Sequence, residues 1–84
     1  MIDKIIEAER MDDLINVFGS FDQNLRILES ELNVKVLDRE EMLHVCGEEE
    51  NVVLAEKTIK GLLTLAAKGE AINDQNVRYV LKLV

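Results

Sequence analysis

The chain has 84 residues, of which 48% are hydrophobic and only 4% aromatic, so it can form one small domain with an aliphatic core. Its 17 acidic and 10 basic residues leave a net charge of −7, which argues against strong unspecific binding to nucleic acid. It has no run of about 20 apolar residues that would span a membrane, and its one cysteine, Cys46, cannot form an internal disulfide. We therefore expect a single domain of residues 1–84 in the cytoplasm, with no membrane contact.

The first predicted elements are a strand and a helix. Residues 4–9 alternate weakly between apolar and polar side chains, which predicts a short strand. The helix begins at Asp12 or Asp13 and ends at Gly19, because glycine suits the positive φ of a helix C-terminus. Its buried side chains are predicted at helical spacing as Met11, Leu14, Ile15 and Phe18.

A second helix is predicted directly after Gly19. Ser20 and Gln23 stand in the S-x-x-Q pattern of a capping box, and Asp22 favours the same helix start through the helix dipole. The helix runs to about Leu32, where Asn33 can adopt a left-handed conformation. Its buried face is predicted to comprise Leu25, Leu28 and Leu32.

Two strands and two helices follow. Val34 and Val36 alternate with Lys35, and residues 42–46 alternate again after a polar turn at 38–41, which predicts a hairpin. A long helix is predicted over 49–67, closed by the Lys68-Gly69 pair, and a last helix begins after Asn73. The main buried stripe of the long helix is predicted as Val52, Ala55, Ile59, Leu62 and Ala66.

The predicted order is β-α-α-β-β-α with one additional helix, which indicates an α+β fold with a three-stranded sheet and its helices on one face. This order, with a glycine-bearing turn between the first two helices, resembles a type I KH domain. The KH motif is a G-x-x-G loop that clamps the backbone of about four nucleotides. Gly19-Ser20-Phe21-Asp22 stands where that loop belongs.

Two longer segments resemble one bacterial family. "LINVFGSFDQNLRILESELNVKV" and "LHVCGEEENVVLAEKTIKGLLTLAAKGEAINDQNVRYVL", in this order and spacing, are similar to the N-terminal KH-like region of PhoH-like proteins. The resemblance implies a link to phosphate starvation and RNA metabolism, and a P-loop ATPase domain that binds ATP and Mg. The chain contains no G-x-x-x-x-G-K-[ST] motif, so we expect a protein fragment without a cofactor that is not an enzyme by itself.

The candidate loop departs from the KH pattern. Its fourth residue is Asp22 and not glycine, and the loop has no basic residue. A capped helix–helix corner, contact with a nucleotide backbone and a phosphate cofactor loop remain open as interpretations, in that order. Phe21 is expected to fill the core rather than to stack on a base, because stacking normally accompanies a basic groove. The candidate residues for nucleic-acid binding are Gly19, Ser20, Phe21, Asp22, Arg26 and Lys35.

Other chemistry is weakly indicated. His44 and Cys46 share one face of a strand, but a zinc site needs four ligands, so we expect no metal and a packing role for the pair. The carboxylates are expected to be solvated or to complement helix dipoles, and no catalytic residue is predicted.

The last third of the chain carries apolar residues outside the main stripes. Gly61 in the middle of a helix costs about 1 kcal/mol relative to alanine, which a close helix contact would offset. The two last helices therefore pack together, or part of their surface docks the missing ATPase domain or a second subunit. The candidate interface residues are Leu54, Gly61, Leu65, Tyr79 and Leu83. Residues 57–84 carry a net charge of +3, against −10 for residues 1–56, and the basic members are Lys57, Lys60, Lys68, Arg78 and Lys82.

Two functional hypotheses follow. The first is an accessory domain of a PhoH-like ATPase that binds single-stranded RNA weakly through a degenerate loop. The alternative is a protein-interaction module, with the ATPase domain or a homo-oligomer as partner, that has lost RNA binding.

Overall fold

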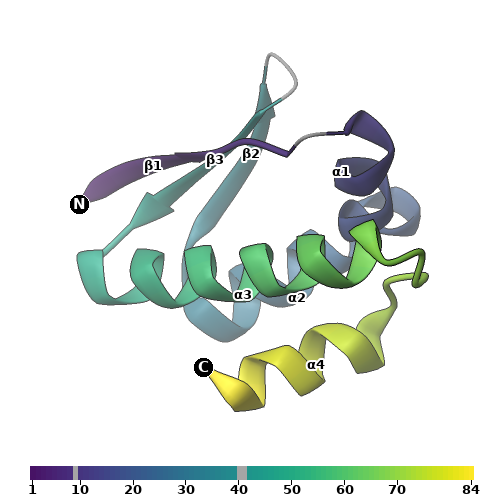
Figure 1. Cartoon of the computed structure of the whole chain (residues 1–84). Coiled ribbons are helices and arrows are strands. Elements are labelled where there is room, and N and C mark those ends of the chain that lie inside the picture. The colour runs from purple at the N-terminus through teal and green to yellow at the C-terminus, as the bar shows by residue number, and fades with distance from the viewer. Residues whose placement is uncertain (9, 40–41) are drawn as a thin grey trace.

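Three strands form one antiparallel sheet in the order β1-β3-β2 (Figure 1). The computed structural model describes residues 1–8, 10–39 and 42–84. Strand β1 covers Ile2–Ile6, β2 covers Lys35–Arg39 and β3 covers Met42–Gly47. The predicted hairpin is confirmed, and the first strand begins and ends earlier than the predicted 4–9. Part of the predicted turn at 38–41 lies outside the described residues.

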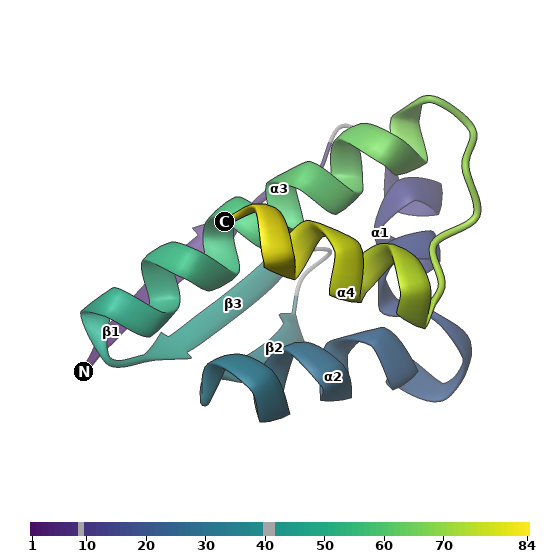
Figure 2. The same cartoon turned by 90° about the horizontal axis from the view of Figure 1, so that it is seen from below.

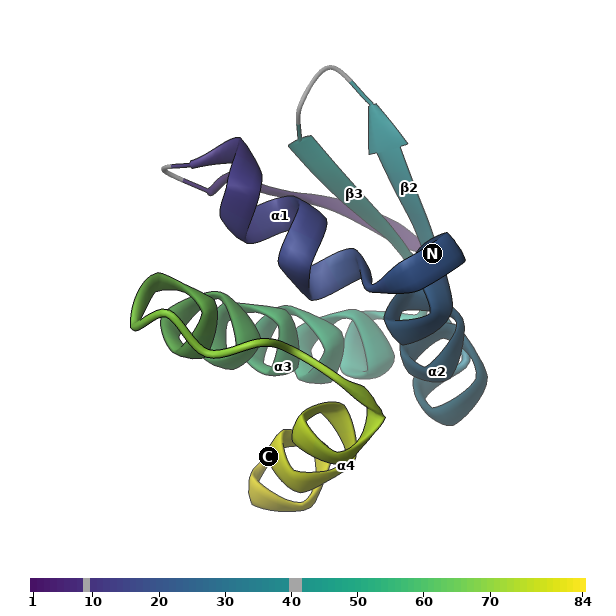
Figure 3. The ribbon, with the colours of Figure 1, turned by 90° about the vertical axis from the view of Figure 1, so that its right-hand side faces the viewer.

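One face of the sheet is covered by helices, as predicted (Figure 3). Ile6 pairs with Leu43 and Val36 pairs with Val45 across the strands, and all four side chains are buried. Because successive side chains of a strand point to opposite faces, this set defines the face of the sheet that meets the core. The alternation of Val34, Val36, Leu43 and Val45 in the sequence was therefore a sound guide to the buried face.

The first helix, α1, covers Met11–Phe18 and buries a different stripe from the predicted one. Leu14, Val17 and Phe18 are buried, whereas Met11 is 40% exposed and Ile15 is 58% exposed. The helix carries two overlapping apolar stripes, and packing against α3 selects the one that contains Val17. The prediction was wrong for Met11 and Ile15 because periodicity alone does not choose between two adjacent stripes.

Helix α2 covers Gln23–Leu32 and lacks the predicted capping box. Residues Ser20–Asp22 form a short 3₁₀ turn, so the helix begins at Gln23 and the N-cap residue is Asp22. Asp22 adopts a left-handed conformation and its side chain makes no capping hydrogen bond. The C-terminal end agrees with prediction, since the helix ends at Leu32 and Asn33 is left-handed.

Helix α3 covers Glu49–Ala67 and is the central element of the core. The predicted stripe is confirmed, because all of its members are buried: Val52, Ala55, Ile59, Leu62 and Ala66. The helix ends as predicted at Lys68 and Gly69, where Gly69 N–H donates to Ala66 O at 2.9 Å and Glu70 N–H donates to Leu65 O at 3.2 Å. These two hydrogen bonds form a Schellman motif around the positive φ of Gly69.

Helix α4 covers Asp74–Leu83 and lies on the side of α3 that faces away from the sheet (Figure 1). Asn73 caps it as predicted, in a reciprocal capping box with Asn76. An added Cβ on Gly61 would lie 3.1 Å from Val80 Cγ1, so this glycine permits the close contact of α3 and α4. The close helix contact predicted from Gly61 is confirmed.

The whole arrangement is the predicted α+β fold, a KH-like fold of type I order with one additional C-terminal helix. None of the helices in the described ranges has both the length and the apolar character needed to cross a membrane.

Candidate nucleic-acid interface

The turn between α1 and α2 holds three residues with positive φ. Gly19 has φ 78° and ψ 178°, and Phe21 and Asp22 have φ 53° and 58°. Gly19 N–H donates to Ile15 O at 3.3 Å, and Asp22 N–H donates to Gly19 O at 3.3 Å. Only glycine adopts the Gly19 conformation without strain, so this glycine is required by the turn itself.

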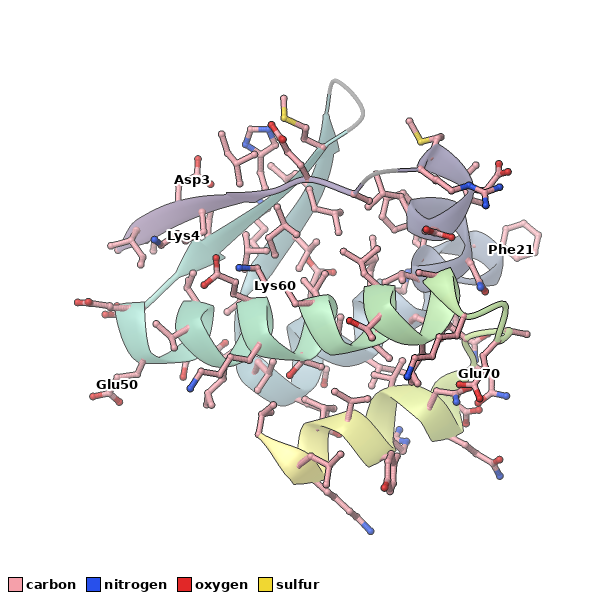
Figure 4. The ribbon with its side chains drawn as sticks, in the orientation of Figure 1. Asp3, Lys4, Phe21, Glu50, Lys60 and Glu70 are labelled. Atoms are coloured by element: carbon pink, nitrogen blue, oxygen red, sulfur yellow. The ribbon has the colours of Figure 1, made fainter. Side chains whose placement is uncertain are left out.

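Phe21 projects from this turn into solvent and is 91% exposed (Figure 4). The prediction that Phe21 fills the core was therefore wrong. The position below the turn is taken by Asn24, which is 2% exposed and lies within 3 Å of an ideal Cβ on Gly19. With that space occupied, the ring of Phe21 has no room inside, and its left-handed backbone directs it outward.

Two asparagines that the sequence pattern did not single out, one on each helix beside the turn, bind the segment between α3 and α4. Asn24 Nδ2 donates to Ile72 O at 3.1 Å, and Asn16 Oδ1 accepts from Ile72 N–H at 2.9 Å. Asn16 Nδ2 also donates to Glu70 O at 2.7 Å. The burial of Asn24 could have been predicted from its spacing, because it precedes Leu28 by four residues and thus lies on the apolar face of α2. This asparagine clamp, Asn16 and Asn24, fixes α4 relative to the turn.

The candidate residues separate into two groups in space. Arg26 lies one helical turn after Asp22 on α2, close to the turn. Lys35 begins β2, beyond the other end of this ten-residue helix, which is about 15 Å long. The structure therefore places Gly19, Phe21, Asp22 and Arg26 in one region and Lys35 in another.

The side of α2 that faces β2 is occupied by a carboxylate. Glu29 Oε2 accepts a hydrogen bond from the backbone N–H of Val36 at 3.0 Å. Strand β2 lies at the edge of the sheet, where backbone donors that point away from the neighbouring strand need a partner outside the sheet, and Glu29 supplies one. Where α2 meets β2, a carboxylate therefore already occupies a backbone donor that a ligand would otherwise use.

The candidate protein-interface residues differ in accessibility. Gly61 faces Val80 inside the chain, and Leu65 is half-buried against the core. Tyr79 is 63% exposed, Leu83 is 67% exposed and Leu54 is 36% exposed. The exposed members therefore lie mainly on α4.

His44 and Cys46 lie on the open face of the sheet. His44 Nδ1 is 3.9 Å from Asp3 Oδ2 on the neighbouring strand. Within residues 1–8, 10–39 and 42–84, no three His, Cys, Asp or Glu side chains are placed to hold a metal ion together.

Comparison with known proteins gives one group of relatives. No family model matches the chain, and no solved structure matches it significantly. The PhoH-like protein of Bacillus subtilis (strain 168) is 32% identical over 72 residues, which is 86% of this chain and 23% of that protein.

Two mycobacterial relatives agree with this match. The PhoH-like protein of Mycobacterium tuberculosis (strain ATCC 25618 / H37Rv) is 33% identical over 73 residues, or 87% of this chain and 21% of that protein. The PhoH-like protein of Mycobacterium leprae (strain TN) is 34% identical over 68 residues, or 81% and 20%. The chain spans about a fifth of the length of these curated relatives. Over most of its length, the chain is therefore similar to one part of these PhoH-like proteins.

Proposed function

We propose that this chain is a non-catalytic accessory module of a PhoH-like protein that binds single-stranded RNA weakly through the turn at residues 19–22. The observation that carries the proposal is the 91% exposure of Phe21 at the tip of this turn. An exposed aromatic ring beside a helix N-terminus is costly for a protein to display and is well suited to stack on a base.

The surrounding groups supply the remaining contacts. The first turn of α2 has backbone N–H groups without a side-chain cap, and such groups bind the oxygens of a phosphate. Arg26 adds a positive charge one helical turn away. Asp22 opposes phosphate binding at the same place, which is why the proposed affinity is weak.

We expect ATP and Mg to bind only to the part of PhoH-like proteins that this chain does not match. The chain has no P-loop motif, and we assign nucleotide binding to the four-fifths of PhoH-like proteins that it does not match. In the complete protein, this module would bring RNA to that nucleotide-binding part.

A titration of the chain with short mixed-sequence single-stranded RNA tests the proposal. We expect amide NMR shifts at residues 19–26 and not at 34–36. With two phosphate contacts, raising the salt from about 50 to about 200 mM should weaken the affinity roughly sevenfold, because each contact releases counterions. The absence of a saturable, salt-dependent interaction at about 50 mM salt would contradict the proposal.

A second candidate function is a protein-interaction module, and the exposed apolar side chains of α4 favour it. Tyr79 and Leu83 are both more than half exposed, and neither lines the groove that contains Phe21. Exposed aromatic and leucine side chains on one helix are typical of a docking surface. The simplest partner would be a second copy of this chain.

The substitution Leu83→Glu tests this second function. If the chain self-associates in sedimentation experiments, we expect Leu83→Glu to weaken the association at least about tenfold, because a charge would enter an apolar contact. Ile15→Glu is the matched control, since Ile15 is also an exposed aliphatic residue but lies on α1. Equal effects of both substitutions, or a monomer at every concentration, would exclude self-association through α4.

A further inference from the structure

We propose that a bound RNA strand leaves the turn along a groove between α2 and α4, and not along the surface where α2 meets β2. This inference rests on the proposed function and assigns a path to the ligand. Figure 2 shows α4 lying alongside both α3 and α2. The additional helix of this fold thereby becomes part of the binding surface.

The α2–α4 groove begins at the exposed ring of Phe21 and has a volume of about 440 Å³. The α2 side chains in it repeat at helical spacing and form one stripe that differs from the buried face of the helix. The residues that matter for binding are Phe21, Arg26, Ile27, Glu31 and Arg78. A smaller depression formed by Glu31, Arg78, Leu81 and Lys82 continues it along α4.

Charge favours this groove over the alternative. Arg26, Arg78 and Lys82 outnumber the single carboxylate of Glu31 along the α2–α4 path. Toward β2, Glu29 accepts the hydrogen bond of the Val36 N–H, and a depression at the start of β2 combines Lys35 with Glu48. A polyanion gains counterion-release free energy only where positive charges are in excess.

Arg78 is well placed to switch from its present partner to a phosphate. Its Nη1 lies 3.4 Å from Glu31 Oε1, and both side chains are at least half exposed. An exposed ion pair of this kind contributes about 0–1 kcal/mol, so a phosphate can displace the carboxylate at little cost. Arginine also forms bidentate hydrogen bonds with phosphate oxygens.

The position of Arg78 relative to Phe21 is set by the fold. Asn16 and Asn24 hold the segment before α4 on the α1–α2 turn, and Gly61 admits Val80 of α4 against α3. These contacts fix the relative positions of the turn and α4, so that Phe21 and Arg78 line the same groove without RNA present. A pre-organised pair of contacts reduces the ordering cost of binding.

The experiment compares Arg78→Glu with Lys60→Glu in RNA binding by the whole 84-residue chain. Both substitutions change the net charge equally and break one ion pair, since Lys60 pairs with Glu56 at 3.8 Å. Lys60 lies on α3, far from Phe21 (Figure 4). We expect Arg78→Glu to weaken binding about tenfold and to reduce the salt slope by about 0.7, the share of one phosphate contact. Lys60→Glu should have a much smaller effect.

Glu31→Gln provides a second variant, for which we expect a gain in RNA affinity. A misfolded chain would not show such a gain. Removing this carboxylate from the groove should tighten binding about twofold to threefold, whereas Glu56→Gln on α3 should not. Equal weakening by Arg78→Glu and Lys60→Glu, or no gain from Glu31→Gln, would overturn the proposed path. If Phe21→Ala weakens binding but neither groove variant changes it, the proposed function stands and only the path is wrong. If the unsubstituted chain binds no RNA, both fall.

Discussion

Replacement of Phe21 by alanine is expected to weaken the binding of single-stranded RNA roughly 5- to 150-fold, the equivalent of the about 1–3 kcal/mol that one stacked base contributes. The free energy of unfolding should stay unchanged, because the ring is 91% exposed and loses no packing. Phenylalanine and alanine both carry a Cβ at this left-handed backbone position, so the comparison measures the effect of the ring alone. Fluorescence anisotropy of a labelled oligonucleotide measures the first quantity, and urea unfolding measures the second.

Two controls distinguish stacking from a general effect of exposed apolar surface. Phe21→Trp should retain or improve binding, since the larger ring still stacks. Tyr79→Ala removes another exposed aromatic side chain, on α4, that does not line the groove, and it should leave RNA binding unchanged. Binding that survives Phe21→Ala would show that the ring has another purpose, and would move attention to the exposed side chains of α4.

The largest effect on stability is expected from Gly19→Ala. The substitution should cost roughly 2–6 kcal/mol, because strain at a glycine-only backbone conformation adds to the loss of a buried hydrogen bond. The new Cβ would lie 2.7 Å from Asn24 Nδ2, so Asn24 must move away from Ile72 O. The midpoint and slope of urea unfolding report this loss.

Gly69→Ala is the matched control for Gly19→Ala. Gly69 also has a positive φ, of 90°, but an added Cβ there meets no atom within 4 Å. Its cost should therefore be limited to backbone strain of about 1–2 kcal/mol. In a background that already carries Asn24→Ala, Gly19→Ala should lose its additional cost. Equal costs for Gly19→Ala and Gly69→Ala would show that Asn24 does not link the turn to the segment before α4.

The relation of the turn to α4 is the part of the site that local sequence features did not reveal. Asn24 and Ile72 are separated by 48 positions, and Asn16 and Ile72 by 56. An asparagine in an amphipathic helix can be solvated or buried, and which of the two occurs depends on whether a distant segment supplies a hydrogen-bond partner. The same holds for Glu29, whose bond to Val36 exists because α2 packs beside the edge strand of the sheet. Lys35 was grouped with the turn by its position in the chain, although α2 separates them.

The sequence by itself determined the elements and most of the core. Strand alternation, the stripe of α3, the glycine and asparagine helix ends and the cap at Asn73 are local signals, and they act through backbone sterics and the burial of apolar side chains at fixed periods. These signals also sufficed for the KH-like order and for the resemblance to PhoH-like proteins.

Only the tertiary structure decided which stripe of α1 is buried, that Phe21 points outward and which groove beside α2 is basic. Each of these three features depends on which side chains from distant segments occupy the same region of the fold. Asn24 fills the space below the turn, and α1 buries Val17 while Ile15 stays exposed. The packing of α4 places Arg78 on the same groove as Arg26. Such competition is settled by packing in three dimensions, because side chains fill the interior at nearly crystalline density and leave no room for a second occupant.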